Sequence, residues 1–421
     1  MSTNAVTVVL LASLQLAGSG PSLAQRPRAG RDSGPGRDPA ILSGGAREEA
    51  AVKIGLLLTS HPDPDTSPYP HQSVHARVTN EVLTAEENGF DTVWIAEHHF
   101  SNTYGILPDP FSYLSYLAAK TSSVKLGAAV MVVPLHHPLR IVENAAFVDI
   151  LSEGRFQLGL GSGYRPYEFE GLGVEYDERH AMMQEEAVPL ILQGFFDKRV
   201  NVDGQFFKIR MDEQSEVFPQ PIQQPHPPIY MAAGTPGSMA FAARNGFGLM
   251  QSALPSIETI GEHVAFYREH MAEAQAPYSQ NPAFGDIDVA RMVYVAESDE
   301  KAREESEEGI VRHTKSFLLS GRTGSYLGDV AEKSDESAFA YEQLVRDTVL
   351  HGSPDTVLRR LERLAQAGAS SVMIHYPPYY GPAKTTKMLE LFANEVLPHV
   401  GAFEQAGAGE ALAKAGVPAA R

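Results

Sequence analysis

Short apolar runs alternate with longer amphipathic segments from residue 52 to residue 397. The apolar runs predict eight strands, at 52–58, 92–96, 124–133, 155–160, 229–233, 248–251, 289–296 and 371–375. Apolar residues at helical spacing predict helices between and after them, at 75–88, 110–120, 138–151, 178–196, 238–245, 257–274, 299–319, 355–367 and 383–397. A strand that is apolar along its whole length is buried on both faces, as in a parallel sheet. The pattern therefore predicts an α/β fold with parallel strands.

The number of strand–helix units separates two architectures. Eight units over about 350 residues indicate a TIM (β/α)8 barrel with insertions. An open doubly wound sheet would normally have fewer strands and a dinucleotide-binding fingerprint. Residues 200–209 predict a hairpin outside the repeat, with Asp203-Gly204 as its turn. We therefore expect one barrel over residues 51–402.

Three segments do not fit the repeat. Residues 1–50 contain no aromatic residue and few core-forming ones, which predicts a disordered N-terminal extension. Residues 5–17 resemble the apolar part of a signal peptide, but no Lys or Arg precedes them, and we favour a dispensable extension. Residues 321–352 are polar and interrupted by glycine, which predicts a long insertion and a candidate active-site lid. Residues 403–421 form a C-terminal tail.

Composition limits the kinds of partner and of cellular compartment that we expect for this protein. The 421 residues include 52 acidic and 34 basic side chains, for a formal net charge of −18. Nucleic acid is excluded as a partner because phosphate binding requires a basic face. The absence of cysteine excludes disulfides, thiolate metal ligands and a cysteine nucleophile, and fits a reducing, cytoplasmic location. No run reaches the roughly 18 consecutive apolar residues of a membrane helix.

Histidines follow two of the predicted strands. In a barrel of this kind, chemistry takes place where strands end and loops begin. Glu97-His98-His99 follow the second strand, and His136-His137 follow the third. An imidazole there suits proton transfer near neutral pH, although a structural role fits each histidine equally well. We expect no metal site, because the paired histidines lack the two-residue spacing that turns both rings to one metal.

Two segments rich in small residues are candidate ligand sites. Residues 159–163 (GLGSG) would let a planar ligand or a phosphate approach the backbone, but they do not match GxGxxG, and a tight turn explains them equally well. Residues 233–238 (AGTPGS) lead into a helix, whose free N–H groups and two hydroxyls would form an anion site. Simple N-capping by Thr235 or Ser238 is the alternative.

Taken in order, these segments resemble the luciferase-like flavin monooxygenase family from about residue 52 to residue 400. Four signals carry the resemblance: 89–94 (GFDTVW) leading to 97–100 (EHHF), 154–156 (GRF) before the glycine cluster, 227–230 (PPIY), and 352–354 (GSP). The resemblance implies a reduced flavin, usually FMNH2, at the carboxyl end of the barrel. It further implies that oxygen adds to flavin C4a and that the resulting C4a-peroxyflavin attacks the substrate.

The resemblance also implies roles for individual residues. His98 matches the active-site histidine of luciferase and would be the acid/base group. Glu97, His99 and His137, beside the same strand ends, are further candidates to contact the substrate or to support the residues that do. The implied flavin contacts are Ala129, Val130, Gly161, Ser162, Gly163, Arg165, Ala233, Gly234, Thr235, Gly237 and Ser238.

This sequence departs from luciferase at three implied positions. The phosphate-binding arginine is replaced by Ser162, and Arg165 is the candidate substitute. Where luciferase has an acidic residue in the phosphate-binding loop, this chain has Gly234, which does not repel a phosphate. Where luciferase has a reactive thiol near the flavin, this chain has Gly161. We therefore expect no thiol-dependent behaviour and a more open flavin face. The resemblance further implies a non-prolyl cis peptide bond between Ala129 and Val130.

Three functions remain open from the sequence. The first is an FMN-dependent monooxygenase that acts on a small aldehyde- or ketone-like substrate with a separate flavin reductase, since no NAD(P)H fingerprint is present. The second is an F420-dependent oxidoreductase of the same superfamily, which transfers hydride. The third is a non-catalytic flavin-binding protein. The resemblance also implies a homodimer.

Overall fold

The computed structural model describes residues 52–62, 71–101, 104–319 and 340–403. The predicted extension at 1–50 and the predicted tail, apart from Phe403, lie outside these residues. Most of the candidate lid, up to residue 339, lies outside them too.

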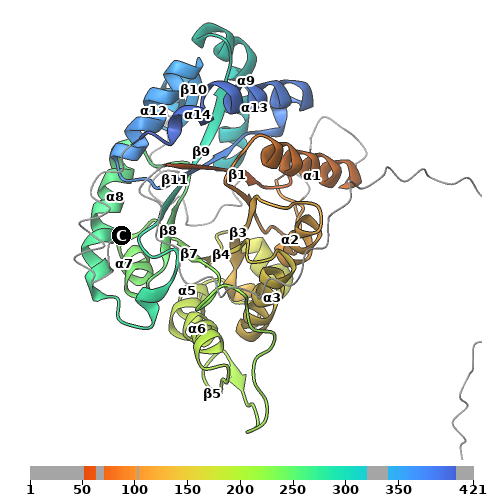
Figure 1. Ribbon diagram of the computed structural model, residues 1–421, viewed down its shortest axis with the longest axis vertical. Helices are drawn as coiled ribbons and strands as arrows, with labels where there is room; N and C mark the ends of the chain where they lie inside the picture. The colour runs from red at the N-terminus through yellow and green to blue at the C-terminus, as the bar shows by residue number, and fades with distance from the viewer. Residues whose placement is uncertain (1–51, 63–70, 102–103, 320–339, 404–421) are drawn as a thin grey trace, which may run out of the picture. The chain divides into compact units, whose positions relative to one another are not determined.

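Eight parallel strands form a closed barrel (Figure 1). They are β1 (Lys53–Leu58), β2 (Thr92–Ile95), β3 (Lys125–Val132), β4 (Phe156–Gly161), β7 (Ile229–Ala232), β8 (Gly248–Gln251), β9 (Ile287–Val295) and β11 (Ser371–His375). Each strand pairs in parallel with the next, and β11 pairs back with β1. The predicted TIM barrel is confirmed, and its strands are the eight apolar runs of the sequence.

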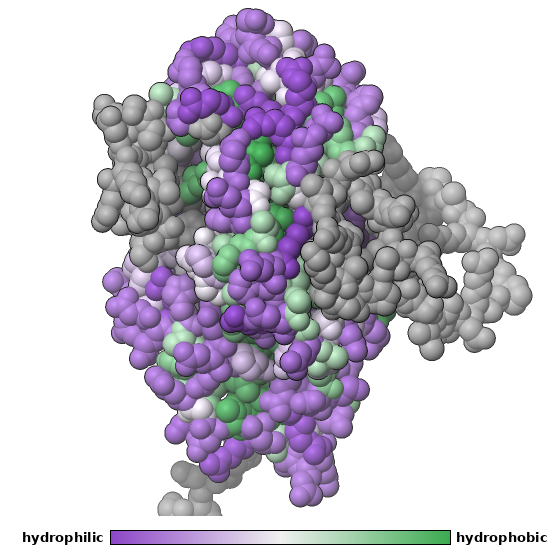
Figure 2. Space-filling model, turned by 90° about the vertical axis from the view of Figure 1, so that its left-hand side faces the viewer, coloured by the Kyte–Doolittle hydropathy of each residue, from purple (hydrophilic) through white to green (hydrophobic). Residues whose placement is uncertain are grey.

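Helices surround the barrel and follow the strands along the chain. The principal ones are α1 (His71–Glu87), α2 (Pro110–Ala118), α3 (Pro138–Leu151), α6 (Val188–Phe196), α7 (Pro236–Arg244), α8 (Ile257–His270), α9 (Asp299–Leu319), α12 (Pro354–Gln366) and α13 (Pro382–Glu395). Their apolar sides pack against the strands in one large core. Figure 2 views the side that carries α7 and α8 and shows a mainly hydrophilic outer surface. No helix in the described ranges combines the length and the apolar character that crossing a bilayer requires.

Several short elements were not predicted. They are α4 (Pro166–Leu172), α11 (Tyr341–Asp347), β10 (Val349–Gly352) and α14 (Leu397–Val400). Strand β10 is fully buried and pairs with β9 outside the closed barrel. The described end of the predicted insertion therefore forms a helix and a buried strand.

Two predicted elements differ in detail. The helix predicted at 178–196 consists of a short α5 (Arg179–Ala181), a π-helical segment (Met182–Ala187) and α6. The predicted hairpin forms from β5 (Val202–Asp203) and β6 (Lys208–Ile209). Its turn spans residues 204–207 instead of Asp203-Gly204, because Asp203 pairs with Lys208 and the Gly204 N–H donates to the Phe207 carbonyl.

Large side chains and glycines alternate inside the barrel. Trp94 and Tyr230 fill its centre, with their ring centroids 5.4 Å apart. A Cβ atom at Gly127 would lie 2.1 Å from the Trp94 ring, so only glycine leaves room for the indole. The interior is therefore packed, which leaves ligand binding to the loops at the ends of the strands.

Candidate active site

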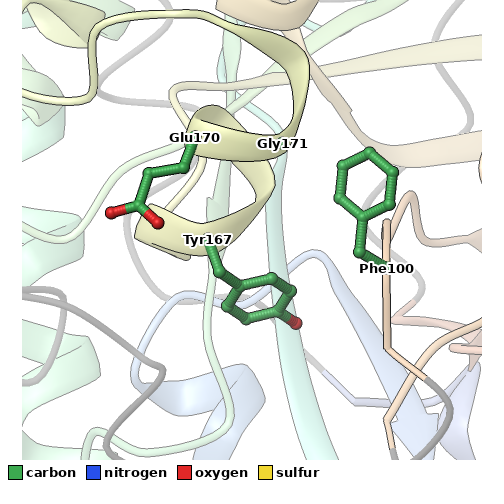
Figure 3. Close-up of a pocket in the computed structure, with 4 residues that line it drawn as sticks. All are labelled: Phe100, Tyr167, Glu170 and Gly171. Carbon is green, nitrogen blue, oxygen red and sulfur yellow. The ribbon is translucent and has the colours of Figure 1, made fainter.

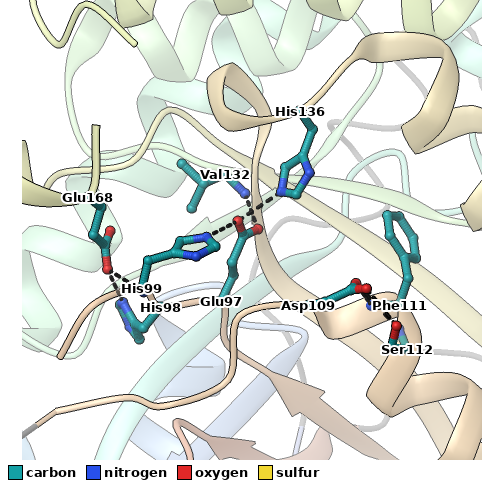
Figure 4. Close-up of polar contacts among 9 residues, drawn as sticks. All are labelled: Glu97, His98, His99, Asp109, Phe111, Ser112, Val132, His136 and Glu168. Carbon is teal, nitrogen blue, oxygen red and sulfur yellow. Dashed lines mark hydrogen bonds and ion pairs between the residues drawn. The ribbon is translucent and has the colours of Figure 1, made fainter. Parts of the chain in front are cut away.

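Polar side chains gather where β2 and β3 end, at the carboxyl end of the barrel (Figure 4). His98 lies beside Glu168, which α4 supplies from the segment after β4. His98 Nδ1 lies 3.1 Å from Glu168 Oε1, and the same oxygen accepts the backbone N–H of His99 at 3.0 Å. Both side chains are buried, with relative exposures of 6% for His98 and 2% for Glu168. Because a carboxylate can only accept, Nδ1 carries the shared hydrogen and Nε2 is left to exchange a proton.

Burial lowers the pKa of His98, and the hydrogen bond to Glu168 opposes this without cancelling it. The pKa therefore lies below its ordinary value of 6.5, and the imidazole is neutral at pH 7. A neutral imidazole held by a carboxylate can accept a proton and return it, which is the behaviour of a general acid/base.

Glu97 joins the ends of β2 and β3. Its Oε1 accepts hydrogen bonds from His99 Nε2 and His136 Nε2, both at 2.8 Å, and its Oε2 accepts the Val132 N–H at 2.8 Å. Burial opposes ionisation of Glu97, but the bonds from His136 and His99 outweigh it, and the pKa is lowered. Burial likewise opposes protonation of His136, but Glu97 outweighs it and raises the pKa. Glu97 therefore holds two loops of the site together.

His136, rather than the predicted His137, reaches this cluster. The short 3-10 turn Val133–Leu135 redirects the chain after β3, and His137 becomes the residue before α3. The His137 side chain is exposed and its ring lies 5.9 Å from that of Phe207. The structure therefore does not bring His137 to this cluster, since consecutive residues after the turn point in different directions, and a role for His137 in contacting or supporting the substrate site stays a prediction.

Arg165 lies in an aromatic cluster beside His98. Its guanidinium carbon is 4.1 Å from the centre of the Tyr104 ring and 5.0 Å from that of Tyr164, and its relative exposure is 3%. The Tyr104 ring is in turn 4.8 Å from the His98 ring. Burial disfavours the charge of Arg165, but Tyr164 and Tyr104 outweigh it and raise the pKa. Arg165, the predicted phosphate ligand, therefore lies one aromatic ring away from His98.

The predicted flavin-facing segments lie at the ends of β3 and β4. The Ala129–Val130 peptide bond is cis, as the resemblance implies. A Cβ atom at Gly161 would lie 2.4 Å from Val130 Cγ2. The Val130 side chain therefore occupies the space that the missing side chain at Gly161 was expected to open. Ser162 and Gly163 follow, and Gly163 adopts a left-handed φ of 74° that favours glycine.

The start of α7 has the hydroxyls of the predicted phosphate site. Thr235 Oγ1 accepts the Ser238 N–H at 3.3 Å, and Ser238 Oγ accepts the Thr235 N–H at 3.1 Å, which is a capping box. The simple capping role is therefore present. Gly234 and Gly237 are exposed, and a Cβ atom at either would meet nothing within 4 Å, while Ala233 is buried. The backbone here is open to an approaching anion, and phosphate binding stays a prediction.

An open hollow of about 460 Å³ lies beside α4, the helix that carries Glu168 (Figure 3). It is lined by Phe100, Tyr167, Glu170 and Gly171. Figure 3 shows the Phe100 ring beside Gly171, with the Glu170 carboxylate directed away from it. A Cβ atom at Gly171 would lie 2.4 Å from that ring, so glycine lets the ring rest against α4.

Sequence reasoning missed Glu168 and Tyr104 as members of the site, and of the two histidines after the third strand it chose His137 instead of His136. Glu168 belongs to a seven-residue helix that was not predicted, and nothing in its spacing from His98 links the two residues. Its position just after the fourth strand was the available signal, since site residues follow strands in a barrel.

The sequence profile of luciferase-like monooxygenases matches residues 52–371. The oxygenase component of flavin-dependent trigonelline monooxygenase from Acinetobacter baylyi is 28% identical over 75% of this chain and 86% of that protein. F420-dependent glucose-6-phosphate dehydrogenase from Kineococcus radiotolerans is 27% identical over 78% and 94%. The alkanal monooxygenase alpha chain of Photorhabdus luminescens is 30% identical, but the match covers 52% of this chain and only 58% of that protein.

A solved structure agrees with the fold. The oxygenating constituent of 3,6-diketocamphane monooxygenase from Pseudomonas putida, in complex with FMN, has a TM-score of 0.67 and 22% identity. The match covers 83% of this chain and 99% of that one.

Proposed function

Because this chain belongs to the luciferase-like monooxygenase family, we propose that it uses reduced FMN and O2 to oxygenate a small organic substrate. The observation that carries the proposal is the buried His98–Glu168 pair at the carboxyl end of the barrel. A neutral imidazole at the family's active-site end, held in one orientation by a carboxylate, supports proton transfer during oxygen insertion. An aldehyde or a ketone is the substrate type that we propose.

The residues present fit a flavin. The half-buried Ala129 and Val130 offer an apolar surface for the ring system, and the backbone of the half-buried Ser162 and Gly163 is partly accessible to a planar group. The open backbone at Gly234 and Gly237, with the hydroxyls of Thr235 and Ser238, suits the phosphate. When bound, reduced FMN supplies the electrons that activate O2.

His98 and its neighbours supply the rest of the chemistry. His98 Nε2 takes a proton from the reacting group and returns it, while Glu168 fixes the ring through Nδ1. Glu97 keeps the loops after β2 and β3 in register through His99, His136 and the Val132 N–H. Burial of these groups keeps water away from the proton that is transferred.

We propose that a separate reductase supplies FMNH2. The trigonelline relative is an oxygenase component, which supports a two-component arrangement. A second candidate function is F420-dependent hydride transfer, which the match to 94% of the glucose-6-phosphate dehydrogenase favours.

The test is to mix the full chain anaerobically with FMNH2, admit air, and follow the flavin absorbance by stopped flow. We expect a spectrum that differs from both reduced and oxidised FMN and outlasts the reaction of free FMNH2. Reoxidation at the rate of free FMNH2 would contradict the proposal. Tight binding of F420 with substrate-dependent reduction would then favour the second candidate.

A further inference from the structure

A buried glutamine adjoins the phosphate loop, residues 233–238, which the proposed function assigns to the flavin phosphate. Gln251 is the last residue of β8, and its relative exposure is 2%. Its Nε2 donates to the Ala233 carbonyl at 2.5 Å, and the Ala233 N–H donates to the Met250 carbonyl at 3.2 Å. Both polar groups of the Ala233 backbone are therefore held by the end of β8.

His263 of α8 fixes the same glutamine from its other side. His263 Nδ1 lies 2.7 Å from Gln251 Oε1. Because an amide oxygen only accepts, Nδ1 carries the shared hydrogen. The reverse orientation of the amide would place its oxygen against the Ala233 carbonyl oxygen, so the amide nitrogen faces Ala233. One chain of hydrogen bonds thus runs from α8 through the end of β8 to the phosphate loop.

The chain that follows Gln251 is held as well. Arg291 of β9 is 1% exposed and donates to the Ser252 carbonyl at 3.3 Å and to the Pro255 carbonyl at 2.8 Å. Ser256 then caps α8. A side chain whose own position is fixed by buried hydrogen bonds can hold a neighbouring group in one orientation. Gln251 is therefore a fixed donor and not one that follows the loop.

The bond from Gln251 sets the direction of one amide of the phosphate loop. The Ala233–Gly234 peptide is trans, and the C=O and N–H bonds of a planar trans peptide point in opposite directions. With the carbonyl directed at Gln251, the Gly234 N–H is directed away from it. A Cβ atom at Gly234 would meet nothing within 4 Å. The Gly234 amide is therefore presented to open space at the start of α7.

Two amides of residues 234–238 are left for a ligand. Pro236 has no N–H, and those of Thr235 and Ser238 belong to the capping box. The N–H groups of Gly234 and Gly237 have no acceptor among the residues that the structure describes. The helix fixes the direction of the Gly237 N–H, whereas glycine at 234 leaves its own peptide free to rotate. Joint binding of a phosphate by both amides thus requires a group that stops this rotation.

We propose that Gln251, supported by His263, is a positioning residue for the flavin phosphate. It acts through the Ala233–Gly234 peptide, which it holds with the Gly234 N–H directed to the phosphate beside the Gly237 N–H. The proposal rests on the function proposed above, because the phosphate belongs to the flavin.

The experiment measures the ratio of the dissociation constants of reduced riboflavin and FMNH2 on the full chain, by anaerobic isothermal titration calorimetry. The two flavins share the ring system, so the ratio isolates the contribution of the phosphate. Gln251→Met keeps the length of the side chain but cannot donate. It should lower the ratio about tenfold, through weaker binding of FMNH2. A merely structural role for Gln251 would reduce stability and leave the ratio unchanged.

Variants of His263 test the support. His263→Leu should lower the ratio in the same direction, because the Gln251 amide loses its second anchor. His263→Asn should restore it, since the asparagine amide nitrogen can replace Nδ1 as the donor. Gln157→Met is the matched control, because Gln157 is 6% exposed near the amino end of β4, and it should keep the wild-type ratio.

The outcomes separate this proposal from the proposed function. A wild-type ratio in Gln251→Met, or in His263→Leu if Gln251→Met does not fold, would overturn the proposal and leave the phosphate site intact. A wild-type chain that binds FMNH2 no more tightly than reduced riboflavin would remove the phosphate site and this proposal together. Because O2 is excluded, neither result depends on the oxygen chemistry that the stopped-flow test follows.

Discussion

At the scale of single residues, His98 is the group whose loss should separate binding from chemistry. His98→Ala should leave FMN binding unchanged and lower the product formed per FMNH2 consumed by about 10²–10⁴-fold, since the ring exchanges protons but does not hold the flavin. The measurement is product yield against FMNH2 consumption, with a substrate that the wild-type protein oxygenates. His226→Gln, which changes another buried histidine, located before β7, should keep the wild-type yield. A wild-type yield in His98→Ala would remove His98 from the mechanism.

Glu97 and His136 predict a pH dependence of stability. The lowered pKa of Glu97 adds stability above its unfolded value near 4.5, which is lost as the pH falls through the folded value. The raised pKa of His136 adds stability below its unfolded value near 6.5, which is lost as the pH rises through the folded value. The stabilising contributions of Glu97 and of His136 are therefore both fully present between pH 4.5 and pH 6.5. Glu97→Gln should therefore reduce the free energy of urea unfolding most between about pH 4.5 and 6.5.

Glu86 provides the control for that measurement. Burial raises its pKa, but backbone N–H groups of residues 122–124 outweigh this and lower it, and no histidine is involved. The effect of Glu86→Gln on the free energy of unfolding should shrink only as the pH falls. The effect of Glu97→Gln should shrink both as the pH falls below about 4.5 and as it rises above about 6.5. An effect of Glu97→Gln that stays constant on the alkaline side would contradict the pairing with His136.

At the scale of elements, the start of α7 has two possible roles, as a helix cap and as a phosphate site. Replacing both Thr235 and Ser238 by alanine should weaken the binding of FMN more than that of riboflavin, because only FMN carries the phosphate. Loss of the cap should also cost about 0.5–2 kcal/mol of stability. Fluorescence titration with both flavins measures the first effect.

Ser256 separates the two roles. It caps α8, where its side chain accepts the Thr259 N–H at 3.2 Å. Ser256→Ala should reduce stability by a similar amount without discriminating between FMN and riboflavin. Equal losses of both flavins in the α7 variant would reject the phosphate assignment.

At the scale of the whole molecule, an exposed apolar surface on α2 and α3 suggests the interface of the expected homodimer. Tyr116 of α2 and Phe147 and Leu151 of α3 are 48%, 51% and 42% exposed. Exposed apolar side chains on neighbouring helices are typical of an association surface. We expect the wild-type chain to elute as a dimer and Leu151→Glu as a monomer in size-exclusion chromatography with light scattering. Leu172→Glu, at a comparable 44% exposure on α4, should leave the dimer intact.

Much of the fold was predictable because a buried parallel strand has a local signature. All eight barrel strands are mainly apolar, with isolated polar residues such as Gln157 in β4 and Arg291 in β9. Burial of both faces gives a strand this local pattern. Strand β10 escaped this reasoning because its four residues, Val349–Gly352, end a polar segment that indicated an insertion. Helix α4 escaped it because seven residues carry too little periodicity.

The sequence by itself determined the barrel, the family resemblance and the position of His98 after the second strand, because each depends on residues close together along the chain. The tertiary structure decided which groups meet. It brought Glu168 to His98 across 70 residues, chose His136 over His137 for Glu97, and linked Ala233 to His263 through Gln251. Closure of the barrel places the ends of distant strands side by side, and short-range patterns carry no record of that contact.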